Sequence, residues 1–189
     1  MTDPILFDVD GVLADFSNHL LRSVGSSLTL ADVDRWDIFS LVSPVQATLA
    51  KALCADPEWW AAMPPMEGAI EAVGAVRRAG ASIVFLSSPW VSCAGWEHVR
   101  RGWLERHFGA RHDSFIAAAS SAKALVRGAA LVEDKPEMID AWTRAHPGRP
   151  AFLFDAPYNR EAAHIDWSRL RRWDAESVAL VVACARRAA

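Results

Sequence analysis

The sequence predicts an α/β protein with a doubly wound parallel sheet and a small helical segment inserted after the first strand. Short apolar runs alternate with helical patterns along most of the chain, and this alternation is typical of a parallel sheet covered by helices on both faces. One long stretch after the first run lacks strand patterns. With 189 residues, of which 52% are hydrophobic, the chain can form one domain with a subdomain and a substantial core.

Five short apolar runs, each followed by polar or turn residues, are the predicted strands. They are residues 5–7, 82–86, 115–118, 130–132 and 151–154. Apolar residues at helical spacing predict helices at 68–79 and 94–107, each followed by a glycine suited to end a helix. Pro136 opens another helix. The apolar run 178–185 is far shorter than the roughly 20 residues that span a bilayer, so we expect it to pack on the core. The predicted buried stripe of the helix at 68–79 comprises Ile70, Val73 and Val76.

The inserted segment covers residues 17–65 and has helical pieces at 18–24 and 44–53. In a doubly wound sheet the active site lies beyond the carboxyl ends of the strands, so an insertion after the first strand would hang over that site. We therefore expect a core domain of residues 1–16 and 66–189 and a helical cap of residues 17–65. The alternative is an ordinary peripheral layer of helices.

Composition and charge argue against several classes of function. Twenty basic and 23 acidic side chains give a net charge of -3, so no strong field attracts nucleic acid or an anionic membrane. The amino-terminal stretch is acidic, which argues against a secretion signal. Three cysteines without metal-binding spacing are typical of reduced thiols. We expect a cytoplasmic protein, a monomer or a homodimer, that binds neither nucleic acid nor membranes.

Two carboxylates, Asp8 and Asp10, flank one residue at the end of the first apolar run, and Gly11 then allows a sharp turn. Carboxylates in such a place would repel each other and lose hydration unless a cation or an anion-handling reaction compensated them. A second acidic pair, Glu133 and Asp134, stands where a predicted strand meets a helix. The alternatives are an acidic turn after a buried strand and, for the second pair, an ordinary helix-opening acid.

The D-V-D-G string at residues 8–11 resembles the first signature of the haloacid dehalogenase-like phosphotransferases, in which the first aspartate is phosphorylated. The wider string D-V-D-G-V-L-A-D-F is more specifically similar to the 5'(3')-deoxyribonucleotidases, magnesium-dependent nucleotide monophosphatases of that group. The resemblance covers roughly residues 4–136 and only faintly the cap. It implies a Rossmann-like haloacid dehalogenase core.

By this resemblance, Asp8 is the nucleophile that forms an aspartyl phosphate, and Asp10 protonates the leaving alcohol and later activates water. Mg²⁺ prefers oxygen ligands, and we expect it to be held by Asp8, the main-chain carbonyl of Asp10, and Asp134. Glu133 could replace Asp134 as a ligand or orient a metal-bound water. Glu133 also stands where the family has an aspartate.

Phosphate oxygens are expected to meet Ser87 and Ser88, which follow a predicted strand, and Lys123. Taken alone, Ser-Ser-Pro is a common turn and an isolated lysine is usually at the surface. The resemblance places Arg100 on a family lysine that touches substrate phosphate, and Phe16 on a residue that stacks on the base. Trp59 and Trp60 fall near a similar aromatic wall, and we expect that they do not both touch substrate.

The predicted function is that of a magnesium-dependent phosphomonoesterase that hydrolyses (deoxy)ribonucleoside monophosphates through an aspartyl phosphate. One alternative is a related phosphatase for a sugar phosphate or another small phosphorylated metabolite. Another is a nucleotide-binding module without turnover, because a fold does not guarantee chemistry. The residues leave base and sugar preference open.

Overall fold

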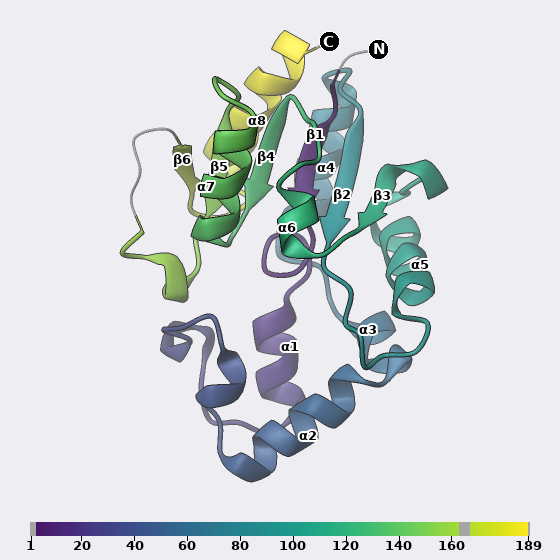
Figure 1. Cartoon of the computed structure of the whole chain (residues 1–189), viewed down its shortest axis with the longest axis vertical. Helices are drawn as coiled ribbons and strands as arrows, with labels where there is room; N and C mark the ends of the chain where they lie inside the picture. Colours follow the sequence, from purple (N-terminus) through teal and green to yellow (C-terminus); the bar gives the residue numbers. More distant parts are fainter. Residues whose placement is uncertain (1–2, 163–166, 189) are drawn as a thin grey trace.

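The structure is a computed structural model that describes residues 3–162 and 167–188, so parts of the predicted core domain (1–2, 163–166 and 189) lie outside the described residues. Its centre is a sheet of six parallel strands in the order β3-β2-β1-β4-β5-β6 (Figure 1). The strands are β1 (Ile5–Asp8), β2 (Ile83–Ser87), β3 (Phe115–Ala117), β4 (Ala130–Glu133), β5 (Ala151–Phe154) and β6 (Trp167–Leu170). This order is that of doubly wound nucleotide-binding folds, and it confirms the predicted fold class.

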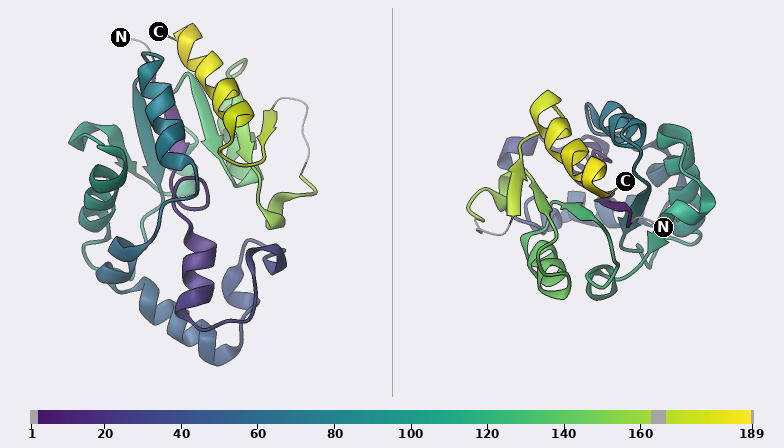
Figure 2. Two further views of the ribbon diagram at one scale, coloured as in Figure 1. Left: turned by 180° about the vertical axis from the view of Figure 1, so that it is seen from behind. Right: turned by 90° about the horizontal axis from the view of Figure 1, so that it is seen from above.

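The side chains of each strand alternate between two separate apolar clusters, one on each face of the sheet. Figure 2 shows α4 and α8 on one side of the sheet and α6 and α7 on the other. The first face is covered by α4 (Ala69–Arg78), α5 (Trp96–Phe108) and α8 (Ala175–Ala188), and the second by α6 (Ser120–Lys123) and α7 (Pro136–Ala145). Because both faces are buried, β1, β4 and β5 are apolar runs without alternating polar residues, and β1 and β4 each end in one acidic residue.

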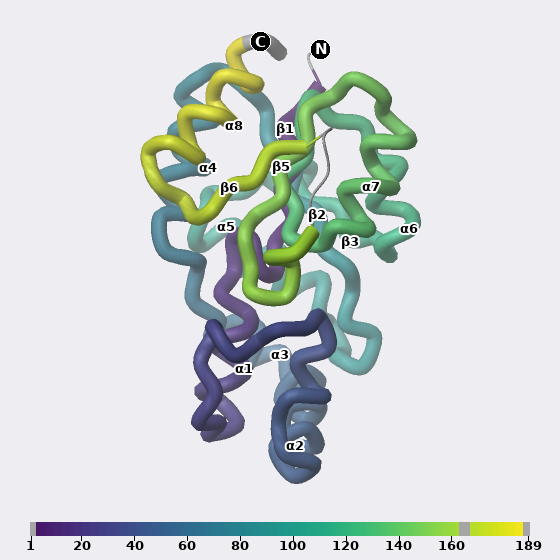
Figure 3. Tube along the Cα trace, turned by 90° about the vertical axis from the view of Figure 1, so that its left-hand side faces the viewer, coloured from purple at the N-terminus to yellow at the C-terminus, as the bar shows by residue number. Residues whose placement is uncertain are grey.

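The segment between β1 and α4 is helical and lies beyond the carboxyl ends of the strands (Figures 1 and 3). Its elements are α1 (Phe16–Ser23), η1 (Leu30–Asp32), η2 (Ile38–Ser40), α2 (Pro44–Cys54) and α3 (Pro57–Ala62). Helix α2 begins as its sequence predicts, because the Ser43 hydroxyl accepts a hydrogen bond from the main-chain N–H of Gln46 and Pro44 occupies the first turn. Within residues 17–65, all of which are described, the structure has no named strand.

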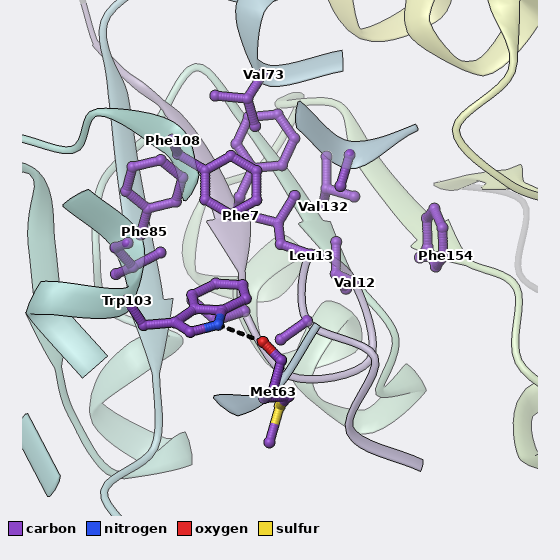
Figure 4. Close-up of a cluster of buried hydrophobic side chains, with 14 of the residues drawn as sticks. Phe7, Val12, Leu13, Met63, Val73, Phe85, Trp103, Phe108, Val132 and Phe154 are labelled. Carbon is purple, nitrogen blue, oxygen red and sulfur yellow. Dashed lines mark hydrogen bonds between the residues drawn. The ribbon is translucent and has the colours of Figure 1, made fainter. Parts of the chain in front are cut away.

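The chain returning from this segment is fixed to the core by buried side chains. The Trp103 indole donates a hydrogen bond of 2.6 Å to the main-chain oxygen of Met63, beside Phe7, Phe85 and Leu13 (Figure 4). Buried aromatic residues contribute strongly to such contacts because they bury a large apolar area. The helical segment and the sheet therefore share one continuous hydrophobic cluster.

The five predicted strands are confirmed, and their ends lie within one residue of the expected positions. The sequence did not indicate β6, α3 or α6. The predicted stripe of α4 was wrong at Ile70, which is 43% exposed, because Ala69 and Ala72 face the core with Val73 and Val76 instead. In the described part of the chain, each helix is too short or too polar to cross a membrane.

Candidate active site

Acidic and polar side chains meet at the carboxyl ends of three adjacent strands. Asp8 ends β1, Ser87 ends β2 and Glu133 ends β4, and Asp134 follows directly. Since β1 lies between β2 and β4, these ends come together where the strand order reverses, the usual ligand position in such sheets. All four side chains are buried. The predicted convergence of the two acidic pairs is therefore present.

Lys123, at the end of α6, is the cation of this cluster. Its Nζ donates to Asp8 Oδ1 and, at 3.1 Å, to Glu133 Oε2. Burial lowers the pKa of Lys123, but the charges of Asp8 and Glu133 outweigh burial and raise that pKa overall, so the ammonium stays protonated. Burial, together with the charge of Glu133, raises the pKa of Asp8 to about 8.

Asp8, Glu133 and Asp134 form a cluster of buried carboxylates, and one oxygen from each lies within 4.8 Å of the other two. Burial and the charges of its two neighbours raise the pKa of Asp134 well above its usual range. Asp134 Oδ1 is buried and has no hydrogen-bond partner in the part of the chain that the structure describes. An all-oxygen set with surplus negative charge and an unpartnered carboxylate oxygen fits Mg²⁺.

The contacts around the cluster differ between Glu133, which ends β4, and Asp134, which follows it. Glu133 Oε2 accepts from Lys123, and its Oε1 accepts from the Lys135 amide at 3.3 Å. Asp134 has one oxygen bound by the Tyr158 hydroxyl and the other unpartnered among the described residues. A carboxylate with an oxygen to spare is the better placed metal ligand, which favours Asp134 over Glu133 for that role.

Tyr158 and Asn159 hold Asp134 from the loop after β5, in η4 (Pro157–Asn159). The Tyr158 hydroxyl donates to Asp134 Oδ2, and Asn159 Nδ2 donates to the Asp134 main-chain oxygen at 2.7 Å. The sequence analysis missed both residues. Tyr158 is the one tyrosine of the chain and follows a correctly predicted strand, so its place at a strand end was the available signal.

Asp10 lies in the turn after β1, and both of its carboxylate oxygens are bound. Ser87 Oγ donates to Oδ2 at 2.9 Å, and Arg100 Nη2 donates to Oδ1 at 2.6 Å. Gly11 has φ +85°, and a Cβ there would lie 2.1 Å from Asp134 Oδ2. The turn therefore requires glycine for its backbone conformation and for the close approach of the Asp134 carboxylate.

A cavity of about 190 Å³ opens above these groups. Its polar floor includes Asp8, Asp10, Ser87, Ser88, Lys123, Glu133 and Asp134, and its walls include Phe16, Trp36, Phe39, Trp60, Trp90 and Tyr158. The Phe16 and Trp60 rings are stacked, with centroids 5.8 Å apart. With a cation bound by the carboxylates and with Lys123 beside them, this floor and the aromatic wall suit a ligand with an anionic group and a flat apolar part.

Most of the predicted site residues line this cavity, and Arg100 is the exception. Its side chain is 0% exposed and lies behind Asp10, outside the described cavity lining. Trp60 contributes to the wall, whereas Trp59 packs behind it against His19. Three further wall residues were not predicted from the sequence, because they belong to no motif: Trp36 and Trp90 lie in loops and Phe39 in η2.

Comparisons with known proteins agree with this arrangement. The family profile described as 5' nucleotidase, deoxy (pyrimidine), cytosolic type C protein (NT5C) matches residues 2–187. A candidate 5'(3')-deoxyribonucleotidase of Bordetella bronchiseptica is 30% identical over 178 residues, which cover 89% of this chain and 92% of that protein. The mitochondrial 5'(3')-deoxyribonucleotidase of Mus musculus is 26% identical over 165 residues, 82% of this chain and 74% of that protein.

Among solved structures, a haloacid dehalogenase (HAD) family hydrolase from Deinococcus radiodurans, crystallised with phosphate and sodium, is similar in fold. Its TM-score is 0.61 at 17% identity, and the match covers 97% of each chain. A HAD-superfamily hydrolase from Ehrlichia chaffeensis gives a TM-score of 0.55 at 14% identity, covering 97% of this chain and 98% of that one. At these identities the similarity concerns the fold.

Proposed function

Because the chain belongs to the NT5C family of 5'(3')-deoxyribonucleotidases, within the haloacid dehalogenase-like hydrolases, we propose that it hydrolyses (deoxy)ribonucleoside monophosphates. The observation that carries this proposal is the cavity itself. Asp8 lies on its floor between Lys123 and the acidic pair of β4, below a wall of aromatic rings. This arrangement offers a nucleophile and a cation to a phosphate, and flat surfaces to a base.

In the proposed reaction, an Asp8 carboxylate oxygen attacks phosphorus and the ester P–O bond breaks. Asp10 gives its proton to the leaving alcohol oxygen, so that the nucleoside departs neutral. Asp10 then takes a proton from water, whose oxygen attacks the aspartyl phosphate and releases inorganic phosphate and Asp8. Lys123 stabilises negative charge on Asp8 and on the phosphoryl oxygens throughout.

Asp8, the main-chain carbonyl of Asp10, and Asp134 would hold the Mg²⁺, with Glu133 engaged by Lys123. When bound, the ion supplies positive charge that offsets the charge of the transferring phosphoryl group. Tyr158 and Asn159 orient Asp134 toward this role through their hydrogen bonds. Ser87 and Ser88 are proposed phosphate contacts, and Ser88 Oγ lies 3.4 Å from Oγ of Ser120, which also lines the cavity.

Residues 17–65 are proposed to form the cap that reads the nucleoside and excludes water. The segment contributes Trp36, Phe39 and Trp60 to the cavity wall, and Phe16 adjoins it at the start of α1. Rings of this kind stack on a base through apolar and π contacts. Phe16 remains the proposed stacking residue, since its ring faces the cavity.

The test is a substrate panel with purified protein and Mg²⁺. Deoxyribo- and ribonucleoside monophosphates are compared with sugar phosphates and with p-nitrophenyl phosphate, and released phosphate is measured. We expect kcat/KM to be highest for nucleoside monophosphates. Faster turnover of sugar phosphates would identify the alternative phosphatase, and nucleotide binding without phosphate release would identify a binding module.

A further inference from the structure

Arg100 is a buried cation whose surroundings are unlike those of a phosphate ligand. It lies in α5 with Trp96 one turn before it and Trp103 one turn after it, and Trp60 of α3 approaches from the inserted segment. The guanidinium carbon lies 4.8 Å from the ring centroid of Trp60, 5.5 Å from that of Trp96 and 5.4 Å from that of Trp103. Three indole rings therefore enclose the charge.

The hydrogen bonds of Arg100 point to one partner. Nη2 donates to Asp10 Oδ1 at 2.6 Å, while Nε and Nη1 are buried and have no hydrogen-bond partner among the described residues. Burying an arginine with a single carboxylate partner is costly, and attraction to the ring faces compensates in part. A buried guanidinium that lies outside the cavity lining and donates to Asp10 is suited to orienting the Asp10 carboxylate.

We infer that Arg100 is a positioning residue that fixes the Asp10 carboxylate and links it to the aromatic wall through Trp60. This inference rests on the proposed function, in which Asp10 exchanges protons with the leaving group and with water. With Arg100 on Oδ1 and Ser87 on Oδ2, the carboxylate has one orientation. A misplacement of about 1 Å at such a group can cost on the order of a hundredfold in rate.

Trp60 connects this contact to the substrate cavity. Its ring lies over the guanidinium on one side and contributes to the cavity wall beside Phe16 on the other. Its Nε1 donates to the main-chain oxygen of Cys54 at 2.9 Å, which fixes the ring. One guanidinium thus lies between the wall that would contact the base and the acid that would protonate the leaving group.

Arginine is suited to this place in a way that lysine is not. A planar guanidinium can lie against rings while donating within its plane to a carboxylate, whereas an ammonium is a compact, strongly hydrated charge. Arg100→Lys therefore keeps the charge but loses the planar contact. Arg101→Lys is the matched control, because Arg101 is the next residue of α5 and pairs with Glu97 at the surface.

The experiment compares leaving groups. Protonation matters for a nucleoside alcohol and little for p-nitrophenolate. Arg100→Lys should therefore lower kcat/KM on the order of a hundredfold for a deoxyribonucleoside monophosphate, but less than about threefold for p-nitrophenyl phosphate. Asp10→Asn should show the same pattern, and Arg101→Lys should match the wild type. The inhibition constant of inorganic phosphate should change less than about threefold, because Arg100 would not touch the anion.

A tenfold or larger rise in the phosphate inhibition constant with little change in kcat would overturn the inference and make Arg100 a phosphate ligand. Equal losses with both leaving groups would also overturn it, in favour of a purely structural role. Circular dichroism and Tm establish that each variant is folded. If Arg100→Lys does not fold, Arg100→Gln is measured in its place and the same outcomes apply. A wild type that turns over no phosphate ester would instead reject the proposed function, and the inference with it.

Discussion

Asp8, Glu133 and Asp134 bring three carboxyl groups into one buried cluster that Lys123 neutralises only in part. Burial and mutual repulsion raise the pKa of Asp8 and of Asp134. Such a cluster is unfavourable for folding by itself, because each ionised group loses water without gaining a full partner. At the residue scale, a cation bound at this cluster would offset its charge, which supports the proposed metal site.

Tyr158 offers a test of this interpretation. Tyr158→Phe removes the hydroxyl that donates to Asp134 Oδ2 and leaves the ring in the cavity wall. Loss of a hydrogen bond that orients a metal ligand should weaken the apparent Mg²⁺ affinity on the order of tenfold, with kcat recovered at saturating Mg²⁺. Titration of phosphate release with Mg²⁺ measures this affinity. An unchanged Mg²⁺ dependence would mean that Tyr158 does not orient the site.

The sequence indicated the site residues that belong to short motifs. Asp8, Asp10 and Asp134 follow apolar runs, and the structure brings them together as predicted. It did not indicate that Tyr158 binds Asp134, because these two residues are 24 positions apart and share no local pattern. The family resemblance placed Arg100 toward phosphate, whereas Arg100 lies outside the described cavity lining and beneath Trp60 of a separate segment. Their catalytic and binding roles remain predictions.

At the scale of elements, the turn after β1 decides how closely the two acidic strand ends approach. Gly11 has φ +85° and leaves room for Asp134. Gly25, in the inserted segment, has φ +62° and no atom within 4 Å of where a Cβ would be. Glycine avoids backbone strain at both positions, but only at Gly11 does it also avoid a steric clash with Asp134.

Alanine substitutions at these two glycines form a matched pair. Gly25→Ala should lower the free energy of unfolding by about 1–2 kcal/mol, because alanine is strained at positive φ. Gly11→Ala should lower it by more, because its Cβ would also clash with Asp134 Oδ2. Only Gly11→Ala should also lower kcat/KM, on the order of a hundredfold, because Asp134 must move. Denaturant unfolding and phosphate release measure the two effects. Full activity in folded Gly11→Ala would show that this close approach is unnecessary.

Sequence patterns located the central strands well because strands buried on both faces are plain apolar runs. They missed β6, whose residues Trp167–Leu170 include a serine and an arginine and lie at the sheet edge. They also missed α3 and α6, which are six and four residues long and too short for helical periodicity to show. Such short elements are fixed by tertiary contacts instead.

For the whole molecule, the strand order sets the site between β1 and β4, and the helical segment lies over it (Figure 1). If Mg²⁺ binds as proposed, stability and metal binding are linked through the same buried acids. Since burial raises the pKa of Asp8 from 3.8 to about 8, its contribution to metal-free stability is full below pH 3.8 and is lost as the pH rises toward 8. Mg²⁺ requires the ionised acid, so its binding strengthens over the same range.

The gain in Tm on adding Mg²⁺ should therefore grow between pH 6 and pH 8. Thermal unfolding with Mg²⁺, against a chelator control at each pH, measures the gain. Asp134→Asn should lose most of the gain at both values. A gain that is independent of pH, or one that survives in Asp134→Asn, would show that the ion binds elsewhere.

Phosphate release by Asp8→Asn tests the central claim most directly, with Asp113→Asn as a control because Asp113 is an exposed acid outside the cavity. The amide of Asp8→Asn keeps the size of the side chain but is a poor nucleophile toward phosphorus. With Mg²⁺ and a deoxyribonucleoside monophosphate, we expect kcat to fall by at least about a thousandfold in Asp8→Asn and to be unchanged in Asp113→Asn. Turnover within tenfold of the wild type in a folded Asp8→Asn protein would contradict an aspartyl phosphate at Asp8.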